Sequence, residues 1–167
     1  HDLTAVTEAW QDLANDPTQP MLNRANLLTL PPGSTFKPVT AAAGIEDMGL
    51  DADSKVRGGA TLSFPGISYK LTNQGGGNCG GNPITLEHAM AISCNVSFGW
   101  IAGEVGQEKL VDQAEKFGFG SRPMSDLPSS ASRVTSDPDA QLEPPQLAQT
   151  GIGQFEVAAT PLQMATV

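Results

Sequence analysis

Apolar residues recur at helical spacing near the start of the chain. Leu3, Val6, Trp10 and Leu13 share one face of a helix, which predicts an amphipathic helix over residues 2–14. The segment NDPTQP follows, and its two prolines end that helix. We expect the large indole of Trp10 to lie in the core or in an interface.

Further helices are predicted where apolar spacing coincides with a helix-start signal. One begins near Ser34 and continues to about residue 45. Another follows Asn82 and Pro83, which combine a capping side chain with proline at the first helical position, and reaches about residue 92. The remaining helices are expected to start near Asn95, to cover residues 108–117 before Gly118, and to start at Thr160-Pro161.

Two other parts of the chain lack the helical pattern. Residues 51–82 are rich in glycine, and the alternating stretches ATLSF and ISYKL flank Pro65-Gly66. This predicts a small β-hairpin over residues 60–71, followed by the flexible loop GGGNCGG. Residues 121–149 are rich in Pro, Ser and Asp, which is typical of a long surface connection.

Composition narrows the classes of partner. With 167 residues, 39% of them hydrophobic, the chain can build a core of one modest domain or of a piece of a larger one. Nine basic against eighteen acidic residues give a net charge of −9, which argues against nucleic acid as a partner. No apolar run approaches the roughly 20 residues that span a bilayer, so a membrane anchor would lie outside this chain.

The cysteines and histidines of the chain do not indicate a metal site. Cys79 and Cys94 lack metal-ligand spacing, and His1 and His88 are too few and too scattered to complete a zinc site. We therefore expect no metal. Composition leaves both a reduced cysteine pair and a single disulfide open.

The stretch PPGSTFKPVTAAAG places Ser34 and Lys37 one turn apart where a helix begins. A serine hydroxyl becomes a nucleophile when a base takes its proton, and a lysine with a lowered pKa can be that base. Free N–H groups at the helix start suit a developing oxyanion. The alternative is a capping serine beside a solvated lysine, but PPGS and the apolar Phe36 favour burial of the site.

A second polar element, Ser93-Cys94-Asn95, falls where one predicted helix ends and the next begins. Such a corner can aim Ser93 and Asn95 into a cleft while Cys94 points away. Ser93 could then relay a proton, and Asn95 could hydrogen-bond a substrate amide. Helix capping is the alternative explanation for both residues.

Three segments in this order, PPGSTFKPVTA, AISCNVSF and GIGQ…ATPLQMA, resemble the transpeptidase domain of penicillin-binding proteins. The lead-in NRANLLTLPPGSTFKP is more similar to the monofunctional class B members. The resemblance implies an α/β (α+β) fold shared with serine β-lactamases, a central antiparallel sheet flanked by helices. This chain would hold mostly the helical part and the hairpin, with the sheet incomplete.

The resemblance also implies residue roles. Ser34 would be the acylated nucleophile, Lys37 its general base, Ser93 the proton shuttle and Asn95 a substrate-binding residue. The reaction would be D,D-transpeptidation of D-alanyl-D-alanine stem peptides of peptidoglycan, without a cofactor, and β-lactams would bind covalently. The family works at the extracytoplasmic face of the bacterial plasma membrane, where a membrane glycosyltransferase of the shape, elongation or division type would be a partner. A Cys79–Cys94 disulfide is expected there.

One family motif is missing from the sequence. No Lys-Thr-Gly, Lys-Ser-Gly or His-Thr-Gly is present. We therefore expect residues 1–167 to be a partial domain without the C-terminal Lys-Thr-Gly strand, the N-terminal pedestal and the anchor, and to be inactive alone. The alternatives are a class A-like serine β-lactamase, although no Glu-x-x-x-Asn is evident, and a non-catalytic β-lactam sensor or interaction module.

Overall fold

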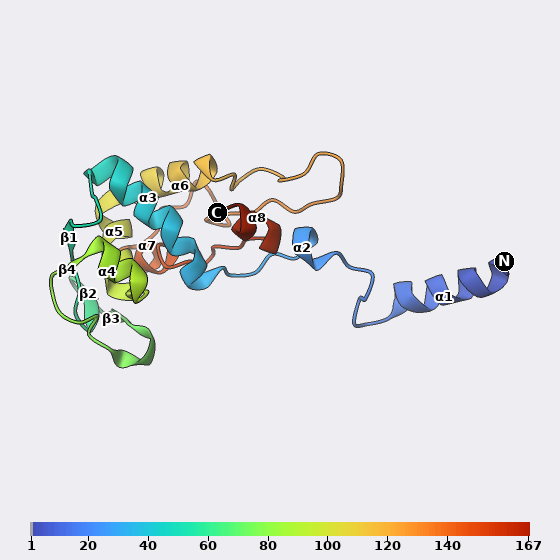
Figure 1. Cartoon of the computed structure of the whole chain (residues 1–167), viewed down its shortest axis with the longest axis horizontal. Helices are drawn as coiled ribbons and strands as arrows, with labels where there is room; N and C mark the ends of the chain where they lie inside the picture. The colour runs from blue at the N-terminus through green and yellow to red at the C-terminus, as the bar shows by residue number, and fades with distance from the viewer. Residues whose placement is uncertain (1) are drawn as a thin grey trace.

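The computed structural model describes residues 2–167, and most of its regular structure is helical (Figure 1). The helices, with two 3-10 turns η1 and η2, are α1 (Leu3–Asn15), α2 (Arg24–Leu27), η1 (Gly33–Phe36), α3 (Lys37–Met48), η2 (Gln74–Gly76), α4 (Leu86–Ala91), α5 (Asn95–Val105), α6 (Gln107–Lys116), α7 (Pro144–Thr150) and α8 (Pro161–Thr166).

Two small antiparallel sheets accompany the helices. Strand β1 (Lys55–Val56) pairs with β4 (Ile84–Thr85), and β2 (Thr61–Phe64) pairs with β3 (Ile67–Thr72). The second pair is the hairpin expected around Pro65-Gly66, so that prediction is confirmed. The α+β architecture without a complete central sheet also agrees with the expectation from the sequence.

Helix α5 is the centre of the core. Its buried side chains are Val96, Ser97, Phe98, Ile101, Ala102 and Val105, together with Gly99. Helices α3, α6 and α7 pack around it, and β2 and β3 contact it from the hairpin side. A helix that is apolar on nearly all sides belongs in the interior. This central position fixes its first residue, Asn95, relative to the start of α3.

Helix α1 forms as predicted but does not pack on the rest of the chain. Asp2 caps it by accepting hydrogen bonds from the Thr4 and Ala5 backbone. Figure 1 shows the helix projecting away from the other elements. Trp10 is 60% exposed, so it does not lie in the core formed by residues 2–167, and its expected place in an interface stays a prediction.

The helix expected after Asn82-Pro83 begins three residues later than predicted. Residues 84 and 85 form β4, and α4 starts at Leu86 with Thr85 as its cap. The Asn82 side chain does not cap a helix, because its Oδ1 accepts a hydrogen bond from Gly58 N at 3.0 Å. A hydrogen bond with Gly58, which is distant in sequence, therefore replaces the helix-capping role that the local sequence predicted for Asn82.

The expected surface connection over residues 121–149 is also too long. Helix α7 begins within it at Pro144, where Glu143 and Gln146 form a reciprocal capping box. Residues 121–143 contain no helix or strand and form the long loop beside α6 and α8 in Figure 1. The predicted helices over 108–117 and from Thr160 are confirmed by α6 and α8.

The close packing of α7 on α5 predicts the effect of a single methyl group. A Cβ at Gly151 would collide with Ala102 and lie 2.9 Å from Phe98 O, so Gly151→Ala should lower the free energy of unfolding by about 1–3 kcal/mol. A methyl group added at Gly103, in α5, would have open space around it, so Gly103→Ala should raise the free energy of unfolding by about 0.5–1 kcal/mol. Urea unfolding of both variants measures the contrast, and equal effects would contradict this packing.

Candidate active site

Ser34 lies in the 3-10 turn η1, directly before α3. Its turn is held from two sides: Gly33 N donates to Gly153 O at 2.8 Å, and the buried Phe36 ring meets Phe119 edge-on at 5.4 Å. Gly153 has a φ of +73°, and any side chain there would collide with Gly33 O. The turn therefore presents an exposed Ser34 on a rigid base.

Lys37, the first residue of α3, is the buried cation of the site, with 1% of its surface exposed. Its Nζ donates to Ser93 O at 2.7 Å, Ser93 Oγ at 2.8 Å and Asn95 Oδ1 at 2.8 Å. The Phe98 ring lies 5.6 Å from the nitrogen. Burial lowers the pKa of Lys37 from 10.5 to about 8, which brings the amine close to the range of a general base.

The corner between α4 and α5 turns Ser93 and Asn95 toward Lys37. Ser93 has a φ of +56°, the left-handed conformation, which reverses the chain direction between the helices. Cys94 points the other way, is buried, and forms a disulfide with Cys79 at a Cα–Cα distance of 5.7 Å. The structure thus brings Lys37, Ser93 and Asn95 together in one hydrogen-bonded group.

Ser34 joins this group through a shared cleft rather than a direct bond. Among residues 2–167, no hydrogen bond links the Ser34 hydroxyl to Lys37, although catalytic bonds commonly tighten only when substrate is present. The cleft has a volume of about 380 Å³. Its lining residues are Ser34, Tyr69, Leu71, Thr72, Asn73, Gln74, Asn95, Ile152 and Gln154.

Several cleft residues were missed by the analysis of the sequence. Tyr69 extends from β3 and accepts a hydrogen bond at its hydroxyl from Gln149 Nε2 at 2.8 Å. Gln154 lies beyond α7, beside Phe155, whose φ of +62° marks a sharp turn. The signals were present: Tyr69 is the single tyrosine of the chain, and Gln154 ends the GIGQ segment.

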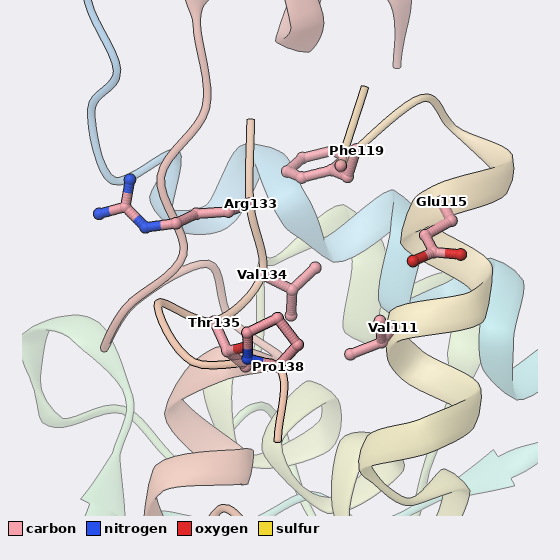
Figure 2. A pocket seen from close by; sticks show the side chains of 8 residues that line it. Val111, Glu115, Phe119, Arg133, Val134, Thr135 and Pro138 are labelled. Carbon is pink, nitrogen blue, oxygen red and sulfur yellow. The ribbon is translucent and has the colours of Figure 1, made fainter. Parts of the chain in front are cut away.

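A second pocket, of about 130 Å³, lies away from this cleft between α6 and the segment 119–138 (Figure 2). Figure 2 shows Val111, Val134 and Pro138 around it, with Glu115 and Arg133 at its margins. None of its lining residues belongs to the Lys37 group. The pocket is a packing gap beneath the long loop, and the cleft at Ser34 is the candidate active site.

Residues 2–167 contain no group of three side chains suited to hold a metal ion, and His1 lies outside the described residues. His88 is exposed on α4. Within the same part of the chain, each helix is too short or too polar to cross a bilayer.

The arrangement can be compared with known families. Residues 3–167 match the family model described as the penicillin binding protein transpeptidase domain. The chain belongs to this family. The resemblance inferred from the three sequence segments is therefore confirmed.

Among curated relatives, peptidoglycan D,D-transpeptidase PbpA of Mycolicibacterium smegmatis is 38% identical over 168 residues, with 100% of this chain and 33% of the relative covered. Peptidoglycan D,D-transpeptidase MrdA of Acinetobacter baumannii is 28% identical, with 93% of this chain and 24% of the relative covered. The chain thus spans about a third or less of the length of these transpeptidases.

Solved structures agree with this assignment. The imipenem acyl-enzyme complex of penicillin-binding protein A from M. tuberculosis matches with a TM-score of 0.86 at 36% identity, covering 99% of this chain and 37% of that one. The complex of penicillin-binding protein PBP2 with MreC from Helicobacter pylori matches with a TM-score of 0.78 at 25% identity, covering 94% and 30%. These matches show that the chain has the helical part of the transpeptidase fold.

The burial of Lys37 predicts its ionisation. The Lys37 ammonium should lose its proton as the pH rises through about 8, because burial disfavours the charged form. Lys116 is the matched control, since its hydrogen bond to Glu46 raises the pKa of that exposed amine. NMR titration of lysines labelled at Cε measures both. A Lys37 that titrates together with Lys116 would show that the amine is hydrated.

The cysteine pairing predicts the number of thiols. The protein isolated without reductant should show no free thiol from Cys79 or Cys94 when it is denatured, and two after reduction. A disulfide that closes a loop of about 15 residues contributes about 3 kcal/mol to the free energy of unfolding in the chain-entropy model. Thiol titration with a chromogenic reagent checks this. Two titratable thiols before reduction would contradict the pairing.

Proposed function

We propose that this chain carries the acylation half of a peptidoglycan D,D-transpeptidase site. The observation that supports this most strongly is the buried Lys37 amine, hydrogen-bonded to Ser93 and Asn95 and placed one turn after Ser34. A solvated lysine would be hydrogen-bonded to water instead of to Ser93 and Asn95, and a serine that only caps a helix would not line a cleft.

Acylation would begin with neutral Lys37. Its amine takes the proton of the Ser34 hydroxyl while Ser34 Oγ attacks the carbonyl carbon of the D-alanyl-D-alanine bond. Backbone N–H groups at the start of the α3 region stabilise the oxyanion. Ser93 passes its hydroxyl proton to the departing amine and receives in return the proton that Lys37 Nζ, at 2.8 Å, took from Ser34, so D-alanine leaves and an ester to Ser34 remains. Asn95 contacts the amide of the stem peptide.

The second step would transfer the acyl group. An amine of a neighbouring stem peptide attacks the ester, the Ser34 oxygen leaves and regains its proton, and a new peptide bond crosslinks the two stems. In a β-lactam the amine that is released stays tethered to the acyl group. It blocks the acceptor position, and the acyl-enzyme persists.

Location and partners are proposed for the whole protein. The M. tuberculosis relative is described as an acyl-enzyme complex with imipenem, and the Helicobacter PBP2 as a complex with MreC. By analogy with the first, we infer covalent β-lactam binding. From the family resemblance, we also propose that the protein works at the extracytoplasmic face of the bacterial plasma membrane and has a membrane glycosyltransferase as a partner. Peptidoglycan stem peptides would be the substrates, and no nucleic acid would bind.

A test of this function uses the protein at the length of its relatives. Penicillin should label Ser34, and Ser34→Ala should abolish the label because no other residue takes the nucleophile's place. Lys37→Ala should slow labelling by about 10²–10⁴-fold, since the hydroxyl loses its base. Ser63→Ala and Lys70→Ala, on exposed positions of the hairpin, are the matched controls and should label normally. Mass spectrometry of the digested adduct locates the site.

The outcomes separate the alternatives. An adduct on Ser93 would overturn the assignment of the nucleophile. Rapid release of hydrolysed penicillin would indicate a β-lactamase, and acylation without crosslinking of a D-alanyl-D-alanine peptide would indicate a sensor. We further propose that residues 1–167 alone are acylated at least about 10²-fold more slowly, because an oxyanion-hole donor from the Lys-Thr-Gly strand would be missing.

A further inference from the structure

Asn73 directly follows β3, on the wall of the cleft that contains Ser34. We propose that Asn73 is a positioning residue: it holds the Ser93–Asn95 corner, and through it Lys37, in the geometry that acylation of Ser34 requires. The inference rests on the proposed function and adds a residue to it.

The side chain of Asn73 joins three separate segments. Its Oδ1 accepts a hydrogen bond from Val96 N at 3.1 Å, and its Nδ2 donates to Gly59 O at 2.8 Å and to Gly77 O at 2.7 Å. Both N–H donors of the amide are therefore used, together with one lone pair of its oxygen. These bonds tie the start of α5 to the segment after β1 and to the loop that leads to Cys79.

Helix α5 needs this external partner. The first N–H groups of a helix have no acceptor inside it, and a side chain at the N-cap usually supplies one. The N-cap of α5 is Cys94, whose side chain makes no capping hydrogen bond and points away into the disulfide with Cys79. Asn73 supplies the missing acceptor from another part of the chain.

The neighbouring residue completes a clamp on the corner. Thr72 O accepts a hydrogen bond from Asn95 Nδ2 at 3.0 Å, so residues 72 and 73 hold two consecutive residues of α5. With Nδ2 held by Thr72, the other end of the Asn95 amide, Oδ1, faces Lys37 Nζ at 2.8 Å. A rotation of this amide would place its NH₂ group against the ammonium.

Lys37 depends on that orientation. The groups around its nitrogen are Ser93, Asn95 and the Phe98 ring, all neutral, and burial is the cause of its lowered pKa. If the corner loosens, water reaches the amine and the pKa rises. The hydrogen bonds of Asn73 go to Val96, Gly59 and Gly77 and not to Lys37, so its effect passes through the corner.

The experiment compares variants of two asparagines from the same loop region. It uses the protein at the full length of its transpeptidase relatives. Asn73→Ala should slow acylation by penicillin about 10- to 100-fold, because a displacement of about 1 Å in a catalytic group costs on the order of 100-fold. The rising limb of its pH–rate profile should also move above pH 8. Asn78→Ala is the control: Asn78 Oδ1 accepts only from Gly80 N at 3.1 Å, and this variant should match the unmutated protein.

Asn73→Ser is the second variant, because serine fills more of the site than alanine and is too short to reach Val96. It should show the same slowing and the same shift of the pH profile, whether or not Asn73→Ala folds. The inference is overturned if these variants acylate as fast as Asn78→Ala, if they slow equally at every pH, or if neither unfolds cooperatively on heating. If the unmutated protein is not acylated at Ser34, the proposed function itself fails, and the inference falls with it.

Discussion

The burial of one ammonium group is the constraint that organises this part of the transpeptidase fold. A charged amine out of water is costly unless its donors are used, and Lys37 finds its three oxygens on only two residues, Ser93 and Asn95. The hydrogen bonds of Lys37 therefore depend on the accurate placement of these two residues. Ser93 must adopt a left-handed conformation, α3 must stay packed on α5, and the chain after Cys94 must enter α5 in the orientation that turns Asn95 toward Lys37. The burial of Lys37 also lowers the pKa of its amine. The energetic cost of burying this amine and its proposed suitability as a general base therefore have the same cause.

The features that local chemistry decides could be predicted from the sequence. Proline after Thr160 predicted the start of α8, and the apolar spacing of residues 108–117 predicted α6 within a residue of its bounds, because the signals lie within each segment itself. The hairpin was predictable for the same reason, since Pro65-Gly66 separates two alternating stretches. The proximity of Lys37 to Ser93 and Asn95 could be anticipated only through the family resemblance, because 56 residues separate the hydrogen-bonded pair of Lys37 and Ser93.

Most of the features that escaped prediction depend on partners far apart in the chain, whereas α7, which was also missed, begins at a local capping box of Glu143 and Gln146. Asn82 looked like a helix cap, but Gly58, 24 positions away, takes its side chain. Tyr69 is placed in the cleft by Gln149, 80 positions away. The loop GGGNCGG was expected to be merely flexible, yet a hydrogen bond from Asn73 to Gly77 and the disulfide at Cys79 hold its middle. For Asn82 the local pattern and the tertiary contact pointed to different uses of the same side chain, and the tertiary contact decided the structure.

The hydrogen bond from Gly33 N to Gly153 O has a consequence for the order in which the molecule is made. Ribosomes release the chain from the N-terminus, so the turn that carries Ser34 emerges long before the residue that supports it. Contacts between distant residues form late because a large loop must close first. The turn that carries Ser34 therefore lacks this hydrogen bond until synthesis has passed the GIGQ segment, so the final geometry of the turn is set late.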